Sequence, residues 1–219
     1  MFSLILLGAC GIDSYSYYYP PSVANSGDNN LYLTHSTNNS DAAFLGYEIY
    51  YRVFEDKAKA DGIASAIYSA ANSSSTAPSV LQNQLTSGTF PSYYGYAFNP
   101  IREPSAAYPL PLLKVGDGSN FRVALSAEGD WTLYINNASV GSPVKRASGK
   151  TFYDSSPGAT WSGTDVDYSG STVASSTTLY LVAFGIAYGF DIGTIKTTTS
   201  MPAVFPNGTT YTAIPISAH

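Results

Sequence analysis

Two long runs of aromatic and β-branched residues constrain the fold of this chain more than any other feature of its sequence. Residues 44–54 read FLGYEIYYRVF, and residues 178–188 read TLYLVAFGIAY. Aromatic and β-branched side chains favour strands, because they pack well on a pleated surface. We therefore predict that both runs are strands and that the protein is mainly β.

One segment has a helical pattern instead. Within residues 57–72, apolar residues from Ile63 to Ala70 recur at the i, i+3, i+4 and i+7 spacing, which places them on one face of a helix. Alanine is frequent there and has the highest helix propensity. A helix is predicted over residues 57–72, followed by a short helical turn over 79–85 that Gly88 ends.

Further strands are predicted in the second half of the chain. Residues 121–125 and 131–135 carry apolar side chains at alternate positions, and the Glu-Gly-Asp sequence at 128–130 is typical of a turn. The two segments are predicted to form a β-hairpin. Residues 192–198 are expected to pair with the second long run, and residues 211–216 to add a short strand.

The composition restricts the class of partner. The 219 residues include 10 Lys and Arg and 15 Asp and Glu, so the net charge is -5 and only 11% of residues are charged. Nucleic-acid binding rests on a basic surface, so no nucleic-acid partner is expected. A surface built from Ser, Thr, Asn, Tyr and Gly indicates a protein outside the cytoplasm. With a single cysteine, the chain forms no internal disulfide.

The N-terminal residues resemble the signal of bacterial lipoproteins. Residues 2–7 are almost wholly apolar, and the tetrad Leu7-Gly8-Ala9-Cys10 is similar to a lipobox, with polar residues directly after it. The resemblance implies that residues 1–9 are the remnant of a signal peptide and that Cys10 carries the lipid. Residues 10–21 are then the lipidated cysteine and its tether.

A lipid on Cys10 makes the membrane the first expected partner. Two or three acyl chains anchor a protein stably, whereas a single chain gives marginal, reversible binding. The expected location is the bacterial cell envelope, at the outer membrane or the cell surface. The alternative interpretation is a buried apolar N-terminal strand with a core thiol, because free cysteine is often simply buried.

The strand sequences resemble the fibronectin type III sandwich. Residues 46–52 (GYEIYYR) are similar to one of its strands, residues 179–189 (LYLVAFGIAYG) to a late strand, and residues 199–202 (TSMP) to its end. The resemblance implies an immunoglobulin- or fibronectin-III-like β-sandwich. Residues 22–219 then form one domain, in which residues 57–177 are an insertion that carries the helix and the hairpin.

A second resemblance leaves an alternative open. Residues 131–141 (WTLYINNASVG) are similar to a hairpin of laminin-G-like and concanavalin-like jelly rolls, many of which bind glycans. Asn137 stands where that hairpin has glycine, and asparagine tolerates the left-handed conformation such a turn requires. This resemblance implies a glycan-binding jelly roll.

The sequence contains little that indicates catalysis. With only two histidines, a His-based triad or metal site has few residues to use, so no catalytic residue, metal or cofactor is expected. The alternative is a carboxylate-based hydrolase that uses Glu55 with Asp56 or Asp165 with Asp167, because paired carboxylates can act as a glycosidase pair. The favoured interpretation of Asp165 and Asp167 is a polar surface strand in a loop.

The 19 tyrosines suggest a binding surface. Tyr93, Tyr94 and Tyr96 cluster in an irregular proline-rich segment and are the predicted ligand patch. The alternative is that they cover an edge of the sandwich. We expect a lipid-anchored, non-catalytic binding or structural module, with a protein or glycan ligand.

Overall fold

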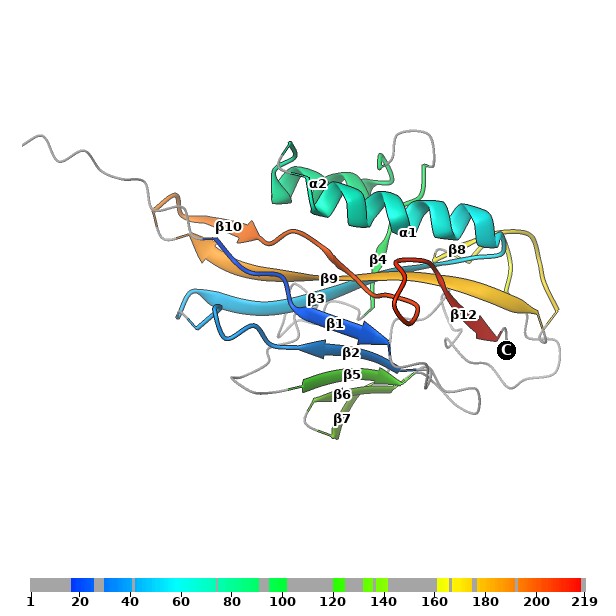
Figure 1. Cartoon of the computed structure of the whole chain (residues 1–219), viewed down its shortest axis with the longest axis horizontal. Coiled ribbons are helices and arrows are strands. Elements are labelled where there is room, and N and C mark those ends of the chain that lie inside the picture. The colour runs from blue at the N-terminus through cyan, green and yellow to red at the C-terminus, as the bar shows by residue number, and fades with distance from the viewer. Residues whose placement is uncertain are drawn as a thin grey trace, which may run out of the picture.

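The computed structural model is a mainly β, curled sandwich-like arrangement of two sheets, with two helices against one of them (Figure 1). The described residues are 17–25, 30–40, 42–73, 75–90, 95–101, 120–124, 132–135, 137–141, 161–165, 167–174, 177–191 and 193–217.

The first sheet has the strand order β1-β2-β5-β6-β7. Its strands are β1 (Ser22–Asn25), β2 (Asn30–Thr34), β5 (Asn120–Ala124), β6 (Thr132–Ile135) and β7 (Ala138–Gly141). The predicted hairpin forms part of this sheet, because β5 and β6 pair antiparallel with Phe121 opposite Ile135.

The second sheet has the order β10-β9-β3-β4, with β11 and β12 also paired to β9 and with β8 paired to β3. Its strands are β3 (Phe44–Phe54), β4 (Asn99–Pro100), β8 (Tyr168–Ser169), β9 (Thr178–Asp191), β10 (Lys196–Thr199), β11 (Ala203–Val204) and β12 (Ile214–Ser217). The predictions of strands at 44–54 and 178–188 are confirmed. The strands predicted at 192–198 and 211–216 are confirmed in part, since β10 and β12 begin only at Lys196 and Ile214 and residues 193–195 form a turn.

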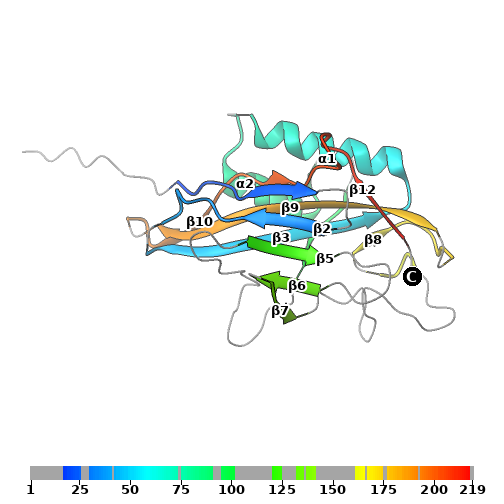
Figure 2. The same cartoon turned by 60° about the horizontal axis from the view of Figure 1, so that its bottom comes forward.

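The two long strands β3 and β9 form the centre of the molecule. They pair antiparallel from Phe44 opposite Gly189 to Phe54 opposite Tyr180. Both faces of this pair are buried, because the first sheet covers one face and the helices cover the other (Figures 1 and 2). This double burial explains why most positions of both strands are apolar, with no simple alternation of apolar and polar residues.

Side-chain alternation divides the core into two clusters. From β3, Tyr47, Ile49, Tyr51 and Val53 pack toward the first sheet, against residues such as Leu31, Leu33, Phe121 and Leu133. On the opposite face, Tyr50 and Phe54 pack with the apolar stripe of the first helix, together with Phe184 and Ile186 of β9.

The helices are α1 (Lys57–Ala71) and α2 (Pro78–Ser87). Asp56 caps α1, since its side chain accepts a hydrogen bond from the Lys59 backbone N–H at 3.0 Å. Helix α2 ends at Gly88, whose φ of 74° is left-handed. Both helical predictions are confirmed, and the second element is a full helix because Pro78 favours a first helical position.

Candidate functional site

A groove of about 300 Å³ lies where three distant parts of the chain meet. One wall is the segment from Pro20 to Val23 that leads into β1, another is the last turn of α1, and the third is formed by residues 201–204 and Tyr211. We call it the tyrosine groove. None of the described residues that line it is charged.

Two tyrosines stack at the groove. The ring centroids of Tyr68 and Tyr211 are 3.6 Å apart, and the ring planes differ by 13°. Each side chain remains 37% exposed. Burial and a hydrogen bond with Tyr68 raise the pKa of the Tyr211 hydroxyl above its ordinary value. The pair is therefore a neutral aromatic surface that is open to solvent.

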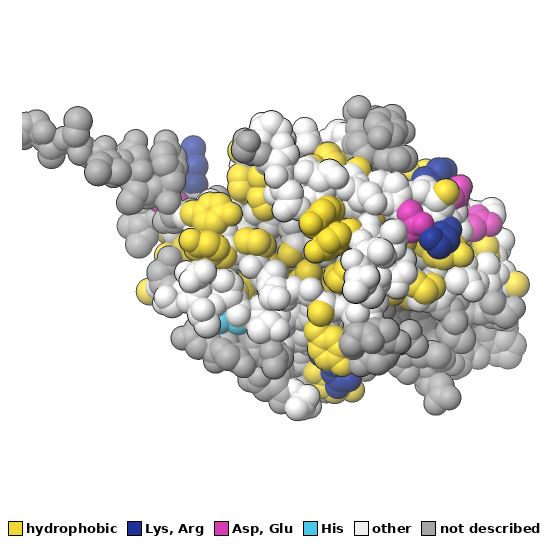
Figure 3. Space-filling view, in the orientation of Figure 1, with side chains coloured by type: hydrophobic (Ala, Val, Ile, Leu, Met, Phe, Trp, Pro, Cys, Tyr) yellow, Lys and Arg dark blue, Asp and Glu magenta, His cyan; other side chains and the backbone are white. Residues whose placement is uncertain are grey.

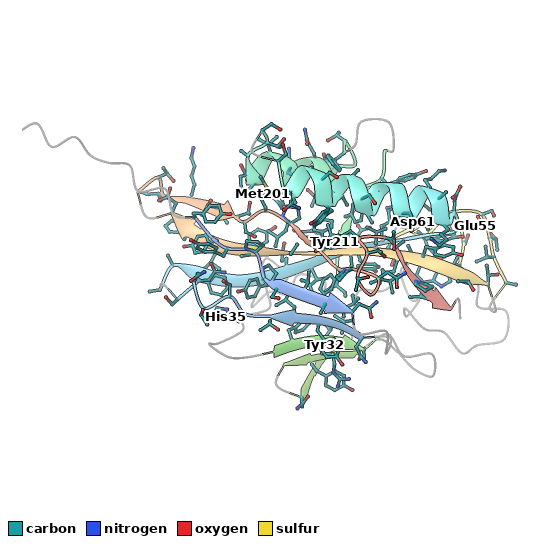
Figure 4. All side chains as sticks on the ribbon, in the orientation of Figure 1. Tyr32, His35, Glu55, Asp61, Met201 and Tyr211 are labelled. Atoms are coloured by element: carbon teal, nitrogen blue, oxygen red, sulfur yellow. The ribbon has the colours of Figure 1, made fainter. Side chains whose placement is uncertain are left out.

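One face of α1 holds Tyr211 in place. Asp61, Ser65 and Tyr68 follow each other at i, i+4 and i+7, so their side chains lie along one side of the helix. Asp61 accepts a hydrogen bond from the Ala213 backbone N–H at 3.0 Å, and the Ser65 hydroxyl donates to the Tyr211 carbonyl at 3.1 Å. Figure 4 shows Asp61 on α1 and Tyr211 below the helix. The backbone at residues 211 and 213, which carries one ring of the stack, is thus held against α1.

The opposite wall is fixed by two glycines of β9. The ring of Tyr18 lies so close to Gly189 that a Cβ on Gly189 would be 1.9 Å from a ring carbon. Pro21 lies similarly over Gly185, where a Cβ would be 2.9 Å from its ring. Tyr18 is 1% exposed and its hydroxyl donates to the Phe190 carbonyl at 3.4 Å. Because Gly185 and Gly189 have no side chains, β9 leaves room for Pro21 and Tyr18 at this wall of the groove.

A buried asparagine holds the same wall from the other side. The Oδ1 atom of Asn39 accepts from the Tyr19 N–H, and its Nδ2 atom donates to the Tyr19 carbonyl, both at 2.8 Å. Asn39 is 2% exposed, so these bonds are shielded from water. The backbone that presents Tyr17, Tyr19 and Pro20 is held in one conformation.

The exposed aromatic residues of the described part gather in this region. Tyr17 and Tyr19 are 58% and 44% exposed, and they directly precede the prolines of the wall. Their rings meet edge to face with centroids 5.1 Å apart. Figure 3 shows hydrophobic side chains along the middle of this face and a group of acidic and basic side chains near the first turns of α1.

A separate polar cluster is buried between the second sheet and α2. Glu48 is fully buried, and its Oε2 atom accepts a hydrogen bond from the Tyr50 hydroxyl. The Tyr50 and Tyr188 hydroxyls are 2.9 Å apart, and Gln82 of α2 donates to Tyr188 at 2.8 Å. Glu48 Oε1 has no hydrogen-bond partner among the described residues. Burial raises the pKa of the Glu48 carboxyl, so the cluster favours a neutral Glu48.

The predicted site residues lie in different places. Leu7, Gly8, Ala9 and Cys10 of the lipobox, and Tyr93 and Tyr94 of the predicted ligand patch, lie outside the described residues. Tyr96 is half-buried against the helix-side core: its ring meets Phe54 with centroids 5.4 Å apart, and the Arg52 guanidinium lies 5.4 Å from its ring centroid. Tyr96 does not line the tyrosine groove.

The interpretation of Asp165 and Asp167 as a polar surface strand is wrong. They are 3% and 0% exposed, and they lie in a turn before β8. Asp165 accepts from the Ser162 N–H at 2.9 Å, and Asp167 accepts from the Tyr51 hydroxyl. The turn is buried because it docks on the first-sheet side of β3, where Tyr51 points.

The second carboxylate pair has structural contacts as well. Glu55 accepts from both the backbone N–H and the hydroxyl of Ser171 at 2.9 Å, which lowers the pKa of Glu55, while Asp56 caps α1. Within the described ranges, no three His, Cys, Asp or Glu side chains gather in a way that holds a metal ion.

Sequence reasoning did not single out Tyr68 or Tyr211. Tyr68 lies one position after Ile67 of the buried stripe and therefore points away from the core, and Tyr211 stands in a short polar segment between threonines. An aromatic residue on the polar side of a predicted helix was the available signal. This signal predicts that Tyr68 is exposed, but it does not predict that the Tyr68 ring stacks on Tyr211.

Comparisons with family models, with curated proteins and with solved structures found no match to this chain. In the part of the chain that the structure describes, neither helix is long and apolar enough to cross a membrane.

Proposed function

We propose that this protein is a lipid-anchored, non-catalytic binding module whose ligand site is the tyrosine groove. The observation that carries the proposal is the stacked, exposed pair of Tyr68 and Tyr211 in an uncharged groove. Exposed aromatic residues on a rigid scaffold supply large contact area at little entropic cost. Binding sites are typically concave and apolar, with a few polar groups that fix orientation.

The strand order supports a fibronectin-III-like scaffold as part of this proposal. In sandwiches of the immunoglobulin class, strands A, B and E share one sheet and strands C, F and G the other. Here β1, β2 and β5 are neighbours in one sheet, and β3, β9 and β10 are neighbours in the other. The proposed insertion at residues 57–177 then supplies β5, a strand of the sandwich itself, besides the helices, β6 and β7, which are additions.

The proposed lipid on Cys10 places the groove near a membrane. Pro20 of the groove wall is ten positions after Cys10, and an extended chain spans at most about 3.5 Å per residue. The groove therefore lies within about 35 Å of the anchor. A ligand site at this distance faces the polymers and proteins of the envelope surface.

The anchor is tested with the full chain expressed from its native upstream region. The wild-type protein is expected to begin at Cys10, to carry a lipid-sized mass increase and to partition into membranes, because only an acylated cysteine anchors it. Cys10→Ala is expected to lose the added mass and the partitioning, whereas Ser14→Ala keeps both. Intact-mass analysis and fractionation measure this, and an unmodified chain that retains residues 1–9 contradicts the anchor.

The groove is tested by retention on four immobilised classes: neutral polysaccharides, acidic polysaccharides, extracellular proteins and phospholipid vesicles. Wild type is expected to bind one class, and Tyr211→Ala is expected to weaken that binding about tenfold or more, as truncation of a central aromatic contact does. Val80→Ala is the matched control, since Val80 is 49% exposed on α2 and does not line the groove. Equal binding by the Tyr211 variant, or no binding to any class, refutes the proposed site.

A further inference from the structure

We infer that the ligand of the tyrosine groove is an uncharged polysaccharide chain whose sugar rings stack on the exposed tyrosine faces. This inference rests on the proposed function and narrows it to one class of ligand. Three properties of the groove lead to it: the charge of its lining, the geometry of its rings, and the polar groups at its rim.

The lining offers no counter-charge. The carboxylate closest in sequence to Tyr68 on the same side of α1 is Asp61, and it is already bound by Lys57 and by the Ala213 backbone N–H. A charged ligand group that entered the groove would lose its hydration without gaining an ionic partner, which is costly. Acidic polysaccharides and charged peptides are therefore disfavoured, although the chain as a whole has a net charge of -5.

The ring geometry fits a flat ligand with an apolar face. An aromatic face carries a negative quadrupole, so it attracts the weakly positive C–H groups on one face of a sugar ring. The Tyr68 and Tyr211 rings are nearly parallel and 3.6 Å apart, so each covers one face of the other and the ligand stacks on an outer face; Asp61 and Ser65 hold the backbone at residues 213 and 211. The stacking surface exists before the ligand arrives, which lowers the entropic cost of binding.

The rim supplies hydrogen-bonding groups for hydroxyls. Ser22 and Asn72 are exposed at the groove, and the amide of Asn72 is oriented by its bond to the Tyr68 carbonyl at 2.8 Å. The phenol hydroxyls of the stacked pair are neutral donors and acceptors. This mixture of ring faces, amide and hydroxyl groups suits a polyhydroxylated ligand better than the acyl chains of a lipid surface.

The aromatic surface continues beyond the groove. Tyr17 and Tyr19 lie just before Pro20 in the chain, and both are more exposed than Tyr68 and Tyr211. A ligand that extends past the groove therefore meets further rings, so a chain of sugars is favoured over a single small molecule.

The test is affinity electrophoresis of the full-length protein in gels that contain one polymer each. The neutral set is dextran, mannan, laminarin, galactan and hydroxyethylcellulose, and the acidic set is alginate and hyaluronan; a proline-rich peptide is titrated separately by fluorescence. We expect at least one neutral polymer to retard the wild-type protein and Tyr211→Ala to abolish the retardation. Tyr211→Phe is expected to retain most of it, because the ring face remains, and Val80→Ala is expected to behave as wild type.

The outcomes separate this inference from the proposed function. Groove-dependent binding only to the acidic polymers, to the proline-rich peptide, to a protein or to vesicles overturns the inference and leaves the binding module intact. Retardation that Tyr211→Phe loses as fully as Tyr211→Ala overturns the stacking argument. Absence of binding to every polymer, protein and vesicle overturns both. Matching circular dichroism spectra and melting temperatures of all variants confirm that each change is local.

Discussion

Replacement of Gly189 by alanine is expected to destabilise the protein by roughly 1–3 kcal/mol and to remove binding at the tyrosine groove. A Cβ on Gly189 would be 1.9 Å from a carbon of the Tyr18 ring, far inside any tolerated contact. Tyr18 is buried, packs near Phe44 and is followed directly by the backbone that Asn39 holds, so its ring has no nearby free space. The ring must leave its position, and the groove wall that begins two residues later is displaced with it.

Thermal and urea unfolding measure the loss of stability, and affinity electrophoresis measures the loss of binding. Gly193→Ala is the matched control, because its Cβ would meet only Asp191 Oδ1 at an ordinary 3.4 Å; we expect it to change the stability by no more than about 0.5 kcal/mol. Tyr18→Ala removes the clashing ring, so the Gly189 substitution is expected to cost much less in that background. If the Gly189→Ala protein melts and binds as wild type does, the contact between Tyr18 and Gly189 does not hold the groove wall in place.

The strands and helices could be predicted because their signals are local. The aromatic run at 44–54 and the apolar spacing from Ile63 to Ala70 each lie within one element and agree with that element's periodicity. The sequence could not show that β3 and β9 pair with each other and are buried on both faces. That burial depends on the first sheet and on the helices, which come from other parts of the chain.

The tyrosine groove could not be predicted, because its walls are far apart in sequence. Tyr68 and Tyr211 meet only because Asp61 and Ser65 bind the backbone at residues 211 and 213. A tyrosine count cannot reveal such a contact. For Tyr96 the local sequence was misleading. Its position in an irregular segment predicted a binding patch, whereas its ring packs on Phe54.

Buried carboxyl groups were missed for a related reason. Asp167 and Glu48 occupy positions where an acidic residue would ordinarily indicate solvent. Both are fully buried, because tyrosines on the central strands supply hydroxyl donors, Tyr51 for Asp167 and Tyr50 for Glu48. Glu48 and Tyr50 share a face because they lie two residues apart in β3, whereas Asp167 reaches Tyr51 from a turn that is distant in sequence.

Substitution of Glu48 by glutamine is expected to stabilise the protein relative to wild type at neutral and alkaline pH, because it replaces a carboxylate that would be charged and buried by a neutral amide. Burial raises the pKa of the Glu48 carboxyl in the folded state. Between the unfolded and the folded pKa, the folded state therefore binds more protons than the unfolded state. The contribution of Glu48 to stability is then greatest below the unfolded pKa, about 4.3, and is lost as the pH rises through the folded value.

The other groups that face Glu48 do not offset this dependence. Gln82 of α2 is neutral, and burial raises the pKa values of the Tyr50 and Tyr188 hydroxyls, so both phenols stay protonated. Glutamine keeps the volume of Glu48 and an oxygen that accepts from Tyr50, but it does not titrate. The stability difference between Glu48→Gln and wild type is therefore expected to grow in favour of the variant from pH 4 to pH 9.

Urea unfolding at pH 4, 7 and 9 measures this difference, with Glu55→Gln as a control of opposite sign. The hydrogen bonds from Ser171 lower the pKa of Glu55, so its contribution is present above the unfolded pKa and is lost as the pH falls through the folded value. Glu55→Gln should therefore weaken the protein at pH 7 and 9 and have little effect in acid. If the stability difference between Glu48→Gln and wild type is the same at pH 4 and pH 9, the folded protein does not disfavour the charged form of Glu48.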